Sequence, residues 1–137
     1  MGRIILHVHG KLKNRNLKVL FEEYTGRLGN RISVIIHSEK HTPAEYVQSL
    51  PKTAILLDEK GQQISSVDFS QEVQKWGLDQ NDMHLAIGPH EGFGEVSQFP
   101  KISLSKMTMT HEFATVFLCE QIYRAFEIIK GTSYHRE

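Results

Sequence analysis

MHLAIG, residues 83–88, is a short apolar run that ends in a glycine. A run of this length without polar alternation is typical of a strand that is buried on both faces of a parallel sheet. The glycine that follows permits close approach of a ligand to the backbone. The run therefore predicts a buried strand, and residues 88–94 after it are either a candidate ligand-binding loop or a plain turn from strand to helix.

The segments on either side alternate between strand and helix. Apolar, β-branched runs predict further strands at residues 3–8, 32–36, 53–57 and 102–104, with a turn at 58–61. Capping and breaking residues predict four helices between these strands. The first is capped by Asn14 or Asn16 and ends at Gly29, and a short second helix runs from Pro43 to Pro51. The third is capped by Ser65 or Ser66 and ends at Gly77, and a long fourth helix runs from His111 to about Lys130. This alternation predicts an α/β fold with a mainly parallel sheet, helices on both faces, and ligands beyond the carboxyl ends of the strands.

Length and composition narrow the class of protein. A chain of 137 residues suits one domain, 1–137. Its single cysteine, Cys119, excludes an internal disulfide and fits a reducing compartment. No apolar run approaches the length needed to cross a membrane, so we expect a cytoplasmic protein without a membrane partner.

The charges are balanced overall but unevenly distributed. Sixteen basic and sixteen acidic residues argue against an indiscriminate nucleic-acid binder. Residues 1–31 nevertheless carry seven basic and two acidic side chains, whereas residues 58–95 carry eight acids and two lysines. The amino-terminal part is therefore a candidate phosphate-facing surface, although ordinary charge scatter on a solvated helix explains it equally well.

The segment before the last helix is a second candidate binding loop. Backbone amides of residues 104–110 can bond the edges of a flat heterocycle while Met107, Met109 and Leu57 cover its faces. The alternative is a short strand with two core methionines. The last helix is apolar on more than one side, which predicts burial on several faces and favours a homodimer.

Eight histidines raise the alternative of a metal hydrolase. His7 and His9 share one face of the first strand, as two zinc ligands can. Further ligands would have to come from His37, His84 or His90, which show no recognisable metal-ligand spacing. We therefore expect partly exposed histidines at strand ends and no metal site.

The carboxyl-terminal motifs resemble those of a known family. The run 102–109, the segment Cys119-Glu120-Gln121-Ile122-Tyr123-Arg124-Ala125 and the ending Tyr134-His135-Arg136-Glu137 are similar to the end of the RlmH family. These are SPOUT-class methyltransferases that use S-adenosylmethionine on N3 of a pseudouridine in large-subunit ribosomal RNA. The resemblance implies a homodimer and a sheet whose carboxyl-terminal segment is threaded into a trefoil knot.

The resemblance also implies roles for single residues. The cofactor site would comprise Leu57, Gly88, Leu104, Ser105, Lys106, Met107, Thr108, Met109 and Thr110. The substrate would contact His111, Tyr134, His135 and Arg136, with the tail supplied by the partner subunit. The candidate catalytic residues are Glu120, Arg124, His135 and Arg136; Glu120, His111 or His135 would accept a proton, and Arg124 or Arg136 would stabilise the developing anion.

The chain departs from the family pattern in its glycine loop. Pro89 and His90 follow Gly88 where the family has a second glycine and then a proline, and Thr110 stands where a proline is usual. Proline has no N–H and holds φ near −65°. The sequence thus leaves two hypotheses: an active ribosomal RNA methyltransferase, or a SPOUT-fold protein that binds RNA or the ribosome without catalysis.

Overall fold

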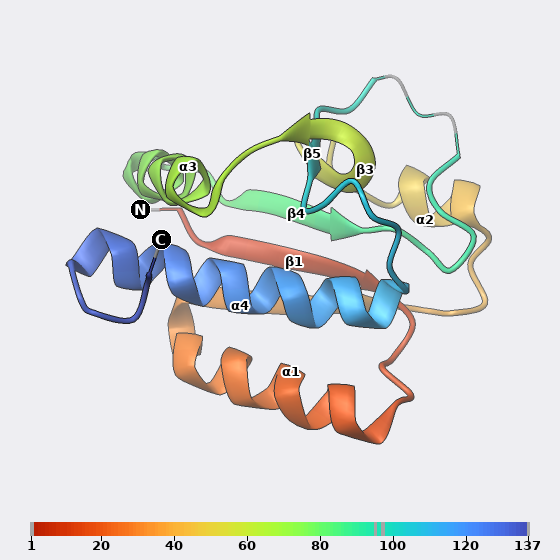
Figure 1. The fold of residues 1–137 in the computed structure, drawn as a ribbon. Helices are drawn as coiled ribbons and strands as arrows, with labels where there is room; N and C mark the ends of the chain where they lie inside the picture. Colours follow the sequence, from red (N-terminus) through yellow and green to blue (C-terminus); the bar gives the residue numbers. More distant parts are fainter. Residues whose placement is uncertain (1, 95, 97, 137) are drawn as a thin grey trace.

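A five-stranded parallel sheet organises the chain (Figure 1). The computed structural model describes residues 2–94, 96 and 98–136. The strands are β1 (Ile4–His9), β2 (Ile32–His37), β3 (Ile55–Gln63), β4 (Met83–Ile87) and β5 (Lys101–Ser103), in the order β2-β1-β4-β3-β5. Every pairing is parallel, which confirms the predicted sheet and places the apolar run 83–87 inside it.

The helices begin where the sequence supplies capping side chains. They are α1 (Arg15–Leu28), the 3-10 turn η1 (Gly29–Arg31), α2 (Pro43–Gln48), α3 (Ser66–Leu78) and α4 (His111–Lys130). Asn14, Thr42, Ser65 and Thr110 each accept a hydrogen bond from a backbone N–H of the first turn. Such caps satisfy amides that have no partner within the helix, which fixes each starting point.

The two faces of the sheet are covered unequally. On one face α4 lies between α1 and α3, and its Leu118 and Ile122 pack with Leu6 and Leu85 in the larger core. The opposite face carries α2, whose Tyr46 anchors a smaller core. Helices therefore lie on both faces, as predicted, and the alternation of side chains along each strand supplies both cores.

The predicted turn at residues 58–61 is wrong. β3 continues through it to Gln63, because β5 pairs with β3 twice: Ile102 is opposite Leu57 and, after a bulge, opposite Gln62. A Cβ on Gly61 would lie 2.7 Å from the carbonyl carbon of Lys101, so only glycine permits this approach. The Asp58 carboxylate accepts from Lys60 N–H, which explains the turn-like sequence inside a strand.

A row of hydrogen-bonded imidazoles lies on the face that α2 partly covers. The His7 ring is 3% exposed; its Nδ1 lies 2.8 Å from His37 Nε2 and its Nε2 lies 2.9 Å from His84 Nδ1. A neutral His7 satisfies both bonds, donating from one nitrogen and accepting at the other. Burial, together with His37 and His84, lowers the pKa of His7 to about 4.

This depressed pKa predicts loss of stability in acid. Between pH 6.5 and about 4 the unfolded chain binds a proton at His7 that the folded chain does not, so stability must fall as pH falls through that window. The full effect is about 3 kcal/mol. Urea unfolding at pH 7.5, 6 and 5 should show a smaller pH dependence for His7→Gln than for the wild type. The exposed His90 supplies the control, His90→Gln, and equal slopes in all three proteins would contradict the assignment.

Candidate functional site

A cavity of about 660 Å³ opens beyond the carboxyl end of β4, beside the bulge of β3 and the start of α4. This volume lies within the range of small-molecule sites. Figure 1 shows the arrowheads of β1 and β4 on the same side of the molecule as the first turn of α4. Three segments line the cavity together with Ala114: residues 57–60, 87–94 and 104–111 without Lys106. Parallel strands thus bring together loops that are far apart in the sequence.

The glycine loop forms a closed turn despite Pro89. Gly92 N–H donates to the Pro89 carbonyl at 2.8 Å, and Gly92 and Gly94 supply the two positive φ angles of this loop, 83° and 73°. Gly88 has a negative φ, but a Cβ there would lie 3.2 Å from the Phe93 ring. Glycine at position 88 therefore avoids a tight contact with the Phe93 ring, and a proline after it is compatible with the turn.

Phe93 ties this loop to the sheet. Its ring stacks on Tyr46 at 6.2 Å between centroids, and the Tyr46 hydroxyl donates to the Ile87 carbonyl at 2.7 Å. Tyr46 is fully buried. The floor of the cavity is therefore fixed by packing on the α2 face of the sheet.

The predicted cofactor loop forms another wall of the cavity. Ser105 Oγ accepts from Met107 N–H at 3.0 Å, and Thr110 Oγ1 accepts from Phe113 N–H at the start of α4. The Met107 side chain is 80% exposed. Of the residues predicted to bind the cofactor, eight line the cavity: Leu57, Gly88, Leu104, Ser105, Met107, Thr108, Met109 and Thr110. Lys106 does not line it.

Charge and hydrogen bonding at the cavity suit a cationic ligand. Three acidic residues line the cavity: Asp58, Glu59 and Glu91. Lys60 is the one lysine or arginine among the described residues that line it. His111, predicted to contact the substrate, also lines it, and its Nδ1 is buried without a hydrogen-bond partner among the residues that the structure describes. Burial lowers the pKa of His111, which keeps this imidazole neutral near pH 7.

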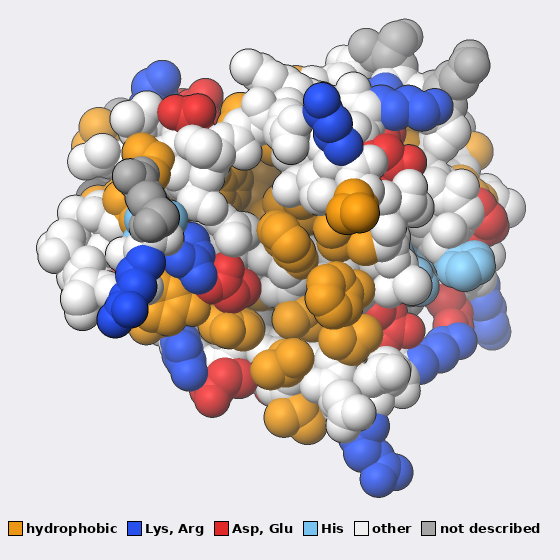
Figure 2. Space-filling view, viewed as in Figure 1, with side chains coloured by type: hydrophobic (Ala, Val, Ile, Leu, Met, Phe, Trp, Pro, Cys, Tyr) orange, Lys and Arg blue, Asp and Glu red, His pale blue; other side chains and the backbone are white. Residues whose placement is uncertain are grey.

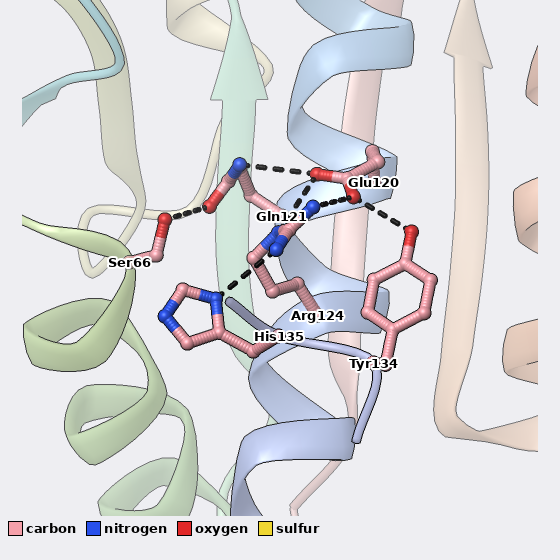
Figure 3. Close-up of polar contacts among 6 residues, drawn as sticks. All are labelled: Ser66, Glu120, Gln121, Arg124, Tyr134 and His135. Carbon is pink, nitrogen blue, oxygen red and sulfur yellow. Dashed lines mark hydrogen bonds and ion pairs between the residues drawn. The ribbon is translucent and has the colours of Figure 1, made fainter. Parts of the chain in front are cut away.

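Three of the four predicted catalytic residues, Glu120, Arg124 and His135, gather beside the second half of α4 (Figure 3). Glu120 contacts both Arg124 and Tyr134, and Arg124 contacts His135. Glu120 lies nine residues along α4 from His111, a distance of about 14 Å along the axis. Within one chain the tail residues are thus brought together with one another but not with the cavity. Arg136 is exposed, and Glu137 lies outside the described residues.

Several lining residues were not predicted as site residues. We assigned Asp58, Glu59 and Lys60 to a turn, yet all three line the cavity. Their position directly after the apolar run 53–57 could have indicated a site, because ligands in parallel sheets bind beyond the ends of strands. Phe93 and Ala114 carry no such signal, because only the packing of the loop and of α4 brings them to the cavity.

The histidines do not converge on a metal position. Across residues 2–94, 96 and 98–136, no three His, Cys, Asp or Glu side chains are arranged to hold an ion. His7 bonds to His37 and His84 through opposite ring nitrogens, so these three rings cannot face one ion. His9 Nε2 lies 2.8 Å from the His41 carbonyl.

Among the residues that the structure describes, no helix is long and apolar enough to cross a bilayer.

Comparisons with known proteins cover nearly the whole chain. Residues 2–135 match the family described as "Predicted SPOUT methyltransferase". Three relatives, each named "Ribosomal RNA large subunit methyltransferase H", are similar in sequence. The protein from Geotalea daltonii is 34% identical over 92% of this chain and 94% of its own length. The protein from Coprothermobacter proteolyticus is 34% identical over 93% of this chain and 94% of its own length. The protein from Porphyromonas gingivalis is 33% identical over 98% of this chain and 99% of its own length.

These matches confirm the resemblance that the carboxyl-terminal motifs indicated. The threading of the tail as a trefoil knot stays a prediction. The family match spans far more than half of the chain, and the relatives exceed 30% identity over more than nine-tenths of it. The chain belongs to the SPOUT methyltransferase family.

Proposed function

We propose that this chain, as one domain over residues 1–137, uses S-adenosylmethionine to methylate N3 of a pseudouridine in large-subunit ribosomal RNA. Three observations support the proposal: the family match, the names of the relatives, and a cavity lined by eight of the nine residues expected to bind the cofactor. The cavity carries most weight, because it joins the glycine loop to the loop before α4. We place this activity in the cytoplasm, where its RNA substrate would be found.

The cavity fits the chemistry of the cofactor. Its three acidic side chains suit the sulfonium and ammonium groups, and the amides and carbonyls of residues 104–110 suit the edges of the adenine. When bound, the cofactor supplies a methyl group that is already activated on sulfur. The residues of the chain must then align the target nitrogen and take its proton.

His111 is the best placed of the proposed proton acceptors. Its neutral ring lines the cavity, and its Nδ1 has no partner within the described part of the chain. Both oxygens of Glu120, by contrast, already accept hydrogen bonds. Among the arginines, Arg136 is exposed and can reach a phosphate or a developing anion on a neighbouring molecule.

A basic loop beside the cavity is a fitting surface for RNA. The Glu112 carboxylate accepts from Lys13 N–H and Asn14 N–H, which fixes residues 11–15 against the start of α4. Lys13 pairs with Glu39 at 2.9 Å. Lys11, Arg15 and Lys18 are exposed and have no acidic partner among the described residues, so their charges are available to phosphates.

The apolar side chains over α4 support the proposed homodimer. Figure 2 shows hydrophobic side chains gathered across the middle of the face that α4 occupies. Phe113 is 50% exposed at the start of α4, close to the cavity wall. A second copy that covers this surface would bury it and would bring its own tail near the cavity.

Calorimetry with S-adenosylmethionine is the first test. We expect micromolar binding to the wild type and binding at least tenfold weaker to Ala114→Leu, because the added side chain enters the cavity. Ala44 is exposed on α2, so Ala44→Leu is the matched control and should bind like the wild type.

The same protein is then incubated with labelled cofactor and with ribosomes that lack the modification. Label in large-subunit RNA, mapped to N3 of a pseudouridine, supports the proposal. Absence of cofactor binding at millimolar concentration would refute it. Retained RNA binding in that case would favour the second hypothesis, a SPOUT-fold RNA-binding protein without catalysis.

Neutralising the basic loop should weaken RNA binding without affecting the cofactor. We expect Lys11→Gln and Arg15→Gln each to lower affinity for a large-subunit RNA fragment and to reduce the slope of log K against log salt by about one. Lys52 is exposed just before the start of β3, whereas the basic loop follows the end of β1, so Lys52→Gln is the control. Unchanged salt slopes in both loop variants would remove this loop from the RNA surface.

A further inference from the structure

Glu120 is the hub of a hydrogen-bonded network that spans α4 and the carboxyl-terminal tail (Figure 3). Its Oε2 accepts from Arg124 Nη2 and from the Tyr134 hydroxyl, both at 2.7 Å. Its Oε1 accepts from Gln121 Nε2 at 3.0 Å and from Arg124 Nε at 3.3 Å. Such charge-assisted bonds are among the stronger ones in proteins. The carboxylate is therefore occupied by structure and is poorly suited to accept a proton.

Arg124 extends this network to the next residue of the tail. Its Nη1 lies 3.0 Å from His135 Nδ1, and its guanidinium lies 5.0 Å from the centre of the Tyr134 ring. A guanidinium only donates, so Nδ1 must be the acceptor and a neutral His135 must carry its hydrogen on Nε2. The tautomer of His135 is thus set by Arg124, which in turn is held by Glu120.

The surroundings of Tyr134 complete the attachment. Its ring meets that of Tyr123 edge to face, with 4.9 Å between the centroids. Burial and the hydrogen bond to Glu120 both raise the pKa of the Tyr134 hydroxyl. The side chains of Glu120 and Arg124 are only 19% and 23% exposed, so solvent competes weakly for these bonds.

One charged residue of the tail lies outside the network. Arg136 follows two anchored residues, is exposed, and has no hydrogen-bond or acidic partner among the described residues. Because Tyr134 and His135 are held against α4, the position of Arg136 is restricted before any ligand arrives. A cation fixed in this way binds a phosphate at a lower entropic cost than one on a free chain end.

We propose that Glu120 and Arg124 are positioning residues that clamp the tail through Tyr134 and His135, so that Arg136 is presented to the phosphate backbone of the RNA substrate. This inference rests on the proposed function, since it takes RNA as the ligand. It gives both residues a role through the tail, in place of proton acceptance by Glu120 and anion stabilisation by Arg124. It also makes Tyr134 and His135 anchors, and leaves Arg136 as the residue that touches RNA.

The test compares variants that break the clamp with variants that spare it. Glu120→Gln removes the carboxylate charge, and Tyr134→Phe removes one hydroxyl and keeps the ring. Tyr123→Phe is the matched control, because no hydrogen bond of the Tyr123 hydroxyl is seen among the described residues. Arg136→Gln removes the proposed contact itself. Should Glu120→Gln fail to fold, Tyr134→Phe carries the comparison alone.

Spectroscopy reports the clamp independently of activity. In the wild type, nitrogen NMR of the histidine rings should show His135 with Nδ1 unprotonated and Nε2 protonated, and carbon NMR should show Tyr134 ionising at higher pH than an exposed tyrosine. Glu120→Gln should shift the His135 nitrogen signals and the pH at which Tyr134 ionises toward the values of solvent-exposed residues. Tyr123→Phe should leave the His135 nitrogen signals unchanged. An Nδ1-protonated His135 in the wild type would overturn the clamp.

Binding and kinetics then separate positioning from catalysis. We expect Tyr134→Phe, Glu120→Gln and Arg136→Gln each to weaken affinity for a large-subunit RNA fragment, and to raise its KM, by roughly five- to tenfold, the size of one lost phosphate contact. Cofactor affinity should stay within about twofold, since the clamp lies away from the cavity. Glu120→Gln combined with Arg136→Gln should be no worse than Arg136→Gln alone.

Two outcomes would overturn the proposal. One is a Glu120→Gln variant with unchanged RNA affinity and KM but a large fall in kcat and a lost limb in its pH profile, which is the behaviour of a general base. The other is unchanged RNA affinity in Arg136→Gln. If the wild type transfers no methyl group at all, the proposed function fails, while the NMR signals and RNA affinities still decide whether the clamp exists.

Discussion

The packing of α4 against the sheet is the contact on which the rest of the molecule depends. Leu118 and Ile122 are fully buried between β1, β4 and the flanking helices. Burial of this kind stabilises each side chain by about 1.5–3 kcal/mol, and it fixes the helix in direction and rotation. Because α4 is held so firmly, its first turn can serve as a cavity wall and its second half as a support for the tail.

The two ends of α4 carry different chemistry. His111 and Ala114 line the cavity at the start of α4, whereas Glu120 and Arg124 hold the tail about two to three turns farther along the helix than Ala114. Within one chain, the cavity and the tail that we propose to contact RNA therefore do not meet. The proposed homodimer resolves this separation, since a tail from one subunit can reach the cavity of the other. The apolar surface over α4 is where the two copies would join.

Local signals predicted most of the fold, and non-local pairing accounts for what they missed. Caps such as Ser65 and apolar runs such as residues 83–87 act within a few residues. The helices, the positions of the strands and two of the three segments that line the cavity were therefore predicted. The predicted end of β3 was wrong because β5, about forty residues later in the chain, pairs with β3 on both sides of a bulge. The tail network was equally invisible, because Tyr134 reaches Glu120 only after the chain folds back on α4.

The most direct measurement mixes two defective subunits. Ala114→Leu blocks the cavity and keeps the tail, whereas Arg136→Gln keeps the cavity and loses the proposed RNA contact. If the tail of one subunit serves the cavity of the other, each mixed dimer contains one complete site. With RNA and cofactor below their wild-type KM, where each parent is nearly inactive, an equimolar mixture after subunit exchange should recover about a quarter of wild-type methyl transfer. Activity of the mixture no greater than the average of the two parents, with exchange confirmed by mass spectrometry, would contradict the account.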